Sequence, residues 1–133
     1  MKRKFVALLL PLVMLIGFVE AKAYTMYGGN FEGKVGKYPI VMSLYLDSSG
    51  YVSGDYLYYN AKTGKLRSQN LSLSGSWSRN SNGTYTVRMN EYTPEGRYCG
   101  NWSVTVNSSR GSISGAMWNS KNTRYSVSLR RSY

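Results

Sequence analysis

The chain has 133 residues, with 17 Lys and Arg against 6 Asp and Glu, no His and one Cys, which gives a net charge of +11. Without His, the Ser-His-Asp and Cys-His arrangements and imidazole metal sites are excluded, and one Cys cannot form an internal disulfide. With 17% charged and 14% aromatic residues, the chain is typical of one small folded domain rather than a disordered tail or a coiled coil.

Residues 1–23 are predicted to be a secretory signal that is cleaved from the protein. Three basic residues at 2–4 precede an apolar run from Phe5 to Phe18, and residues 21–23 fit the A-x-A pattern of a cleavage site before Tyr24. The apolar run is shorter than the roughly 20 residues that span a bilayer as a helix. We therefore expect export to a bacterial periplasm or to the exterior, and a single, still strongly basic β domain over residues 24–133.

From Tyr24 onward, apolar and polar residues alternate with the period of two that is typical of strands. Clusters of Gly, Asn, Ser and Asp, which favour turns, separate the alternating segments. The predicted strands span residues 24–33, 38–47, 51–60, 66–78, 84–92, 96–106, 111–118 and 123–131. Because the links between them are short, the eight strands are expected to form an antiparallel meander.

The alternation gives these strands one apolar face, while the other face carries mainly Ser, Thr, Asn, Lys and Arg. The apolar face comprises Ile40, Met42, Leu44, Leu46, Val52, Gly54, Tyr56, Tyr58, Leu71, Leu73, Gly75, Trp77, Tyr85, Val87, Met89, Glu91, Tyr98, Gly100, Trp102, Val104, Val106, Ile113, Gly115, Met117, Tyr125, Val127 and Leu129. A continuous apolar face over eight strands has to be covered. We predict an all-β, up-and-down barrel, with a β-sandwich as the alternative.

Four glycines share the phase of the apolar face. Gly54, Gly75, Gly100 and Gly115 each follow an apolar residue by two positions. Since glycine weakens a strand, its repeated use in one phase indicates bending of the strands or relief of crowding at a narrow interior. This pattern favours closure into a barrel.

Two segments carry a resemblance to known proteins. GKYPIVMSL at residues 36–44, followed by VSGDYLY at residues 52–58, resembles a pattern in small secreted bacterial β proteins of unassigned function. The apolar-Ser-Gly element is also similar to strands of avidin-like and lipocalin-like barrels. The resemblance implies a fold and no activity, and no biotin contacts are carried over from it.

Glu91 is the most informative acidic residue, because it shares the phase of Val87 and Met89 on the apolar face. A buried carboxylate must be paired, hydrogen-bonded or protonated. It could orient a ligand or act as an acid or base inside the barrel, or it could lie at the barrel mouth, held by a Tyr hydroxyl or an Arg. Only Glu32 could be proposed as a second carboxylate for glycosidase chemistry, and no catalytic constellation is visible, so we do not expect an enzyme.

The aromatic residues suggest two further candidate sites. Together with Glu91, an interior ligand pocket could be lined by Tyr56, Tyr58, Trp77 and Trp102, for which core packing is the alternative. A surface recognition patch could be formed by Tyr45, Tyr51 and Tyr59, which alternate to the other face. Tyr is also a strong strand former that tolerates partial exposure, which is the alternative explanation for that patch.

Cys99 is expected on the outer face, beside Asn101 and Ser103. In an oxidising compartment, such a Cys could link two chains through a disulfide, or it could be a partly covered thiol without a role. We therefore expect either a monomer or a Cys99-linked dimer.

The basic residues are dispersed over the predicted turns rather than gathered in one run. This distribution suits attraction to an anionic glycan or an envelope protein better than binding of nucleic acid. The expected function is that of a non-catalytic secreted or periplasmic binding protein of a bacterial envelope, which engages a small ligand, a glycan or a protein. A small outer-membrane β-barrel protein is the alternative, and no cofactor or metal is expected.

Overall fold

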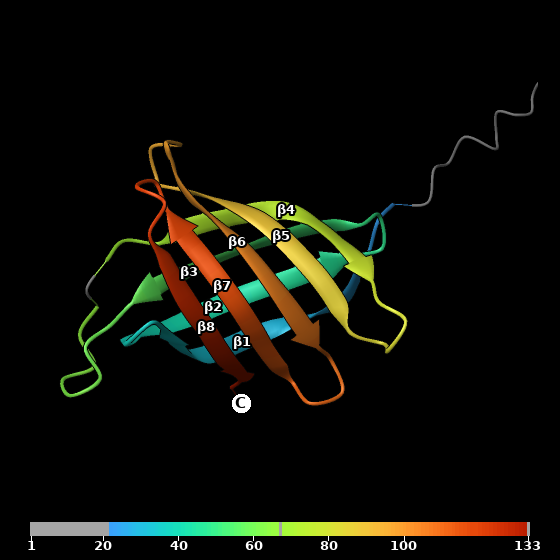
Figure 1. Cartoon of the computed structure of the whole chain (residues 1–133), viewed down its shortest axis with the longest axis horizontal. Coiled ribbons are helices and arrows are strands. Elements are labelled where there is room, and N and C mark those ends of the chain that lie inside the picture. Colours follow the sequence, from blue (N-terminus) through green and yellow to red (C-terminus); the bar gives the residue numbers. More distant parts are fainter. Residues whose placement is uncertain (1–21, 67, 133) are drawn as a thin grey trace, which may run out of the picture.

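Eight antiparallel strands form the fold in a computed structural model, which describes residues 22–66 and 68–132 (Figure 1). Nearly all of the predicted signal segment 1–23 lies outside the described residues. The strands are β1 (Thr25–Val35), β2 (Tyr38–Asp47), β3 (Tyr51–Tyr58), β4 (Leu71–Arg79), β5 (Tyr85–Tyr92), β6 (Tyr98–Asn107), β7 (Ser112–Asn119) and β8 (Arg124–Arg131).

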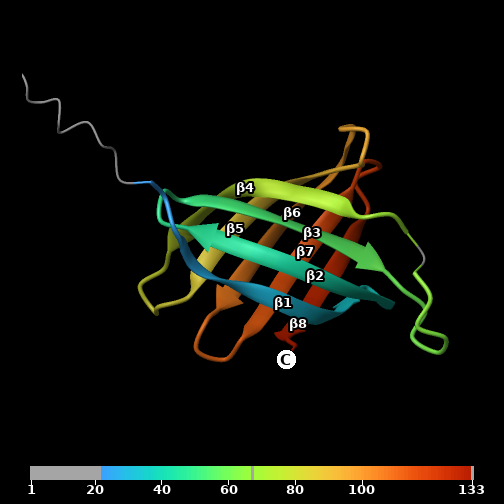
Figure 2. The ribbon, with the colours of Figure 1, turned by 180° about the vertical axis from the view of Figure 1, so that it is seen from behind.

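Each strand pairs with its neighbours in the sequence, and the barrel closes between β1 and β8. This closing register runs from Phe31 opposite Arg131 to Val35 opposite Val127. In Figures 1 and 2, β1 to β4 cross β5 to β8 on the two sides of the barrel. The predicted up-and-down barrel is therefore confirmed, and the β-sandwich alternative is wrong.

The fourth strand begins later than predicted, at Leu71 rather than at residue 66. The described residues between β3 and β4 form a loop that projects from the barrel (green in Figure 1). Its turn is stabilised locally, because the Asn60 side chain accepts a hydrogen bond from the amide of Lys62 at 2.9 Å. The backbone oxygen of Asn60 also accepts from the amide of Gly64 at 2.7 Å. These local bonds satisfy the amides of Lys62 and Gly64 within the turn that separates the two predicted strands.

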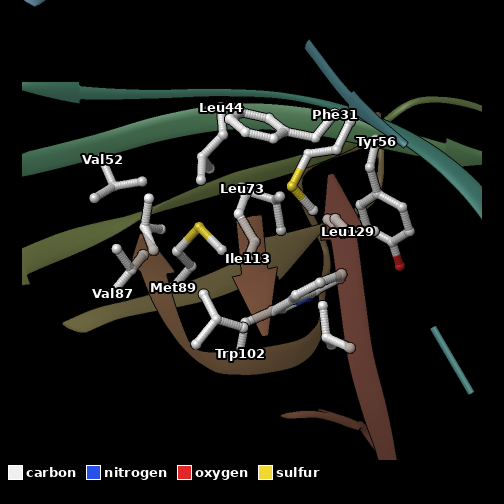
Figure 3. Packing of buried hydrophobic residues seen from close by; sticks show 14 of the residues in the cluster. Phe31, Leu44, Val52, Tyr56, Leu73, Val87, Met89, Trp102, Ile113 and Leu129 are labelled. Carbon is white, nitrogen blue, oxygen red and sulfur yellow. The ribbon is translucent and has the colours of Figure 1, made fainter. Parts of the chain in front are cut away.

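The predicted apolar face points into the barrel and forms its core. Figure 3 shows this packing, with Val52 and Val87 toward one side of the cluster and Tyr56 and Trp102 toward the other. Tyr98 is the exception, because its side chain is 46% exposed. An irregularity in the pairing of β5 with β6 shifts the register there and turns Tyr98 outward.

The glycines of the inner face allow adjacent strands to approach closely. A Cβ at Gly75 would lie 2.8 Å from the Cα of Met89 on β5, and one at Gly115 would lie 2.7 Å from the Cα of Val104 on β6. Real Cβ atoms essentially never come so close to a backbone atom. The glycines thus relieve crowding at these positions, but the crowding comes from the backbone of the next strand and not from a narrow interior, as was predicted.

Candidate functional site

A pocket of about 400 Å³ opens at one end of the barrel, where β3, β5 and β7 end and β4, β6 and β8 begin. Five tyrosines contribute to its wall, which is made of residues that lie near the ends of strands. The lining residues are Tyr38, Pro39, Tyr56, Tyr58, Tyr59, Leu71, Glu91, Cys99, Met117, Asn119 and Tyr125. The pocket therefore draws on every strand except β1.

Glu91 lies near the C-terminal end of β5, where it lines this pocket, and it is only 4% exposed. Its Oε1 accepts a hydrogen bond from the Tyr56 hydroxyl at 2.9 Å and another from the Trp102 indole N–H at 2.8 Å. Among the residues that the structure describes, its Oε2 accepts only from the Cys99 thiol, with 3.1 Å between Sγ and the oxygen. Because a thiol is a weak donor, Oε2 is the less satisfied of the two oxygens.

An aromatic cluster of four rings continues from Glu91 toward the rim. The Tyr56 ring meets those of Trp102 and Tyr58 edge to face, with centroids 5.0 and 5.4 Å apart. Tyr58 in turn packs edge to face against Tyr38, at 6.2 Å. Such arrangements stabilise aromatic clusters beyond their burial.

Both inner tyrosines stay neutral at physiological pH. Burial, followed by the charge of Glu91, raises the pKa of the Tyr56 hydroxyl far above its usual value of about 10. Burial also raises the pKa of Tyr58. Tyr56 can therefore act as a hydrogen-bond donor to the carboxylate over the whole physiological range.

The predicted outward orientation of Cys99 is wrong. In the pairing of β5 with β6, Glu91 lies opposite Gly100 and Tyr92 lies opposite Tyr98, so Cys99 is an additional residue on β6. This bulge turns its thiol into the pocket, onto Glu91. Burial and then the hydrogen bond to Glu91 raise the pKa of Cys99 to about 12, although the positive charge of Arg97 opposes this. The disulfide between two chains stays a prediction.

The other predicted site residues divide between the two ends of the barrel. Tyr56, Tyr58 and Trp102 gather around Glu91, whereas Trp77 lies at the opposite end and donates its indole N–H to the backbone oxygen of Asp47 at 2.8 Å. Trp77 also packs edge to face against Tyr85, so it contributes to the closure of that end and not to the pocket.

The predicted surface patch is also divided. Tyr45 and Tyr51 are 40% and 49% exposed on the outside of β2 and β3, whereas Tyr59 lines the pocket mouth. A role of Tyr45 and Tyr51 in recognition stays a prediction.

Sequence reasoning missed several pocket residues, although Leu71, Met117 and Tyr125 were placed on the inner face. The missed candidates for the site are Tyr38, Pro39, Leu71, Met117, Asn119 and Tyr125. In a meander, alternate strand ends meet at the same end of the barrel, so the inner-face residues at these ends could have been grouped from the order of the strands.

Comparisons with protein-family models, with curated proteins and with solved structures found no match to this chain. In the part of the chain that the structure describes, no helix is long and apolar enough to cross a membrane.

Proposed function

We propose that this protein is an exported, non-catalytic binding protein of a bacterial envelope, and that a small ligand enters the tyrosine-lined pocket. The observation that carries the proposal is a buried carboxylate, Glu91, beside a pocket of about 400 Å³. Small-molecule sites are typically concave, roughly 300–1,000 Å³ in volume and mostly apolar, with a few placed polar groups. The signal-like residues 1–23 and the resemblance to small secreted proteins support export.

The chemistry of the pocket favours binding over catalysis. Cys99 is the strongest potential nucleophile in the wall, yet with a pKa of about 12 it stays protonated at neutral pH. Because the thiolate is the reactive form, this thiol is a poor nucleophile. Glu91 is held by neutral donors, which suits a group that orients a ligand.

The outer face favours this proposal over an outer-membrane barrel. Membrane barrels present an apolar band outward. Here the main apolar cluster fills the interior, and the outward positions of β4 are serines. These serines are Ser72, Ser74, Ser76 and Ser78. The exposed apolar side chains on the outside of β2 and β3 are Val41, Tyr45 and Tyr51.

The binding of anilinonaphthalene sulfonate, whose emission rises in apolar sites, tests the proposal. We expect one saturable site in the wild-type protein and a loss of at least about tenfold in affinity for Leu71→Trp, since the indole would fill the pocket. Leu57→Trp is the matched control, because Leu57 lies on the outer wall of β3. Unchanged binding to the Leu71 variant, or no binding to the wild type, would contradict the proposal.

A further inference from the structure

The charge of Glu91 has no partner of opposite sign among the residues that donate to it. Within the described chain, these donors are a phenol, an indole N–H and a thiol, all of them neutral. A carboxylate can accept about four hydrogen bonds, and a buried one is costly unless it is paired. A ligand that reaches Oε2 from the pocket could therefore supply both a stronger donor and a positive charge.

The wall above Glu91 is suited to an organic cation. The rings of Tyr38, Tyr58, Tyr59 and Tyr125 line the pocket. Aromatic faces carry negative potential and attract ammonium groups within about 6 Å, more strongly where water is excluded. A carboxylate beneath several tyrosines thus provides two kinds of contact for one ammonium group.

The rim of the pocket carries positive charge, opposite in sign to Glu91. The Lys37 ammonium lies 5.8 Å from the centre of the Tyr38 ring, and the positive charge of Arg97 is near enough to Cys99 to oppose the rise in the pKa of its thiol. The loops at this end also carry Lys62, Lys65 and Lys121, and Arg124 begins β8, against one acidic residue, Glu95. A ligand that is only a cation would be repelled here, whereas an anionic group would be attracted.

On the basis of the proposed function, we infer that the pocket takes a bipolar small molecule. Its ammonium group hydrogen-bonds to Oε2 of Glu91, its apolar middle lies along the tyrosines, and its anionic group stays at the rim near Lys37 and Arg97. The ligand class is thus an amino acid-like zwitterion with its two charges separated by an apolar spacer.

Calorimetric titration with three probes that share one alkyl chain tests this inference. The probes are ω-aminooctanoate, octanoate and octylammonium. We expect ω-aminooctanoate to bind at least about tenfold more tightly than either singly charged probe, with its advantage over octylammonium decreasing as salt rises. Equal binding of the three probes by the wild-type protein would overturn the inference, and this comparison needs no variant to fold.

Two sets of variants assign the charges. Glu91→Gln should abolish the advantage of ω-aminooctanoate over octanoate, and Lys37→Gln combined with Arg97→Gln should abolish its advantage over octylammonium. The matched control changes Arg88 on the outer wall and Arg110 in a turn at the opposite end to Gln, and should leave all affinities within about twofold. Unaltered selectivity in both sets would overturn the inference.

The failure of this inference can be distinguished from failure of the proposed function. If anilinonaphthalene sulfonate binds and is lost in Leu71→Trp, but ω-aminooctanoate has no advantage, the pocket binds ligands and the bipolar class is wrong. If the affinity for the fluorescent probe is also unchanged in Leu71→Trp, the proposed function itself is wrong.

Discussion

Replacement of Glu91 by Ala should lower the free energy of unfolding by about 3–5 kcal/mol. The substitution leaves the indole N–H of Trp102 buried without its acceptor, and it leaves the Tyr56 hydroxyl with only the long bond to the Tyr58 hydroxyl at 3.4 Å, because both groups donate to the same carboxylate oxygen. Each unsatisfied buried donor costs about 1–3 kcal/mol, and the lost side-chain volume adds to this. Urea denaturation followed by tryptophan fluorescence measures the change.

Two matched variants show whether the loss of stability comes from the missing hydrogen-bond acceptor or from the missing charge. Glu91→Gln keeps an oxygen for both donors and should cost less than about 1.5 kcal/mol. Glu32→Ala removes an exposed carboxylate from β1 and should change stability by less than about 0.5 kcal/mol. If Glu91→Ala were as stable as Glu32→Ala, the carboxylate would not organise the aromatic cluster.

A second large effect is expected from Gly75→Ala on β4. The added Cβ would collide with the backbone of β5, at the carbonyl of Arg88 and 2.8 Å from the Cα of Met89. Backbone atoms in a closed ladder cannot move aside as a flexible side chain can, so we expect a loss of about 3 kcal/mol or more, or failure to fold. Thermal unfolding monitored by circular dichroism tests this expectation.

The control for this variant is the neighbouring position on the same strand. Ser74 lies half-buried on the outward side of β4, and Ser74→Ala should have an effect within about 1 kcal/mol. If the Gly75→Ala variant had the same melting temperature as the Ser74→Ala variant, the stability of the barrel would not depend on the close approach of the strands at this glycine.

Much of the barrel could be predicted because apolar and polar residues alternate within each strand. The alternation of Val87, Met89 and Glu91 requires a covered inner face, and the short turns restrict the topology to a meander. Gly75 and Gly115 favoured closure into a barrel, whereas the close approach of adjacent strands at these positions was found only in the structure. The burial of Glu91 follows from the same alternation. A Tyr hydroxyl was among its expected partners, whereas the indole of Trp102 and the thiol of Cys99 were not.

The remaining features depend on the register between strands, which alternation within one strand does not contain. The bulge at Cys99 reverses the phase of β6, so that the thiol points inward and Tyr98 points outward. Likewise, Trp77 is on the inner face as predicted, but the direction of β4 places it at the end opposite to Glu91. A phase predicts which face a residue occupies, whereas its height along the barrel depends on strand length and stagger.

Glu91 links the stability of the barrel to its proposed function. The carboxylate orients Tyr56 and Trp102, and the same contacts hold Glu91 in the wall of the pocket. A preorganised polar group of this kind lowers the conformational cost of binding. The stability and the binding effects of Glu91 variants therefore have to be measured together.

The most direct test of this account is the NMR spectrum of the indole N–H groups during titration with anilinonaphthalene sulfonate. Trp102 donates to Glu91 beside the pocket, whereas Trp77 donates to the backbone of Asp47 at the other end, so the two signals report on the two ends of one barrel. If the pocket is the binding site, the Trp102 signal should shift in a saturable manner, while the Trp77 signal stays in place. A shift of Trp77 alone, or binding that moves neither signal, would contradict the account.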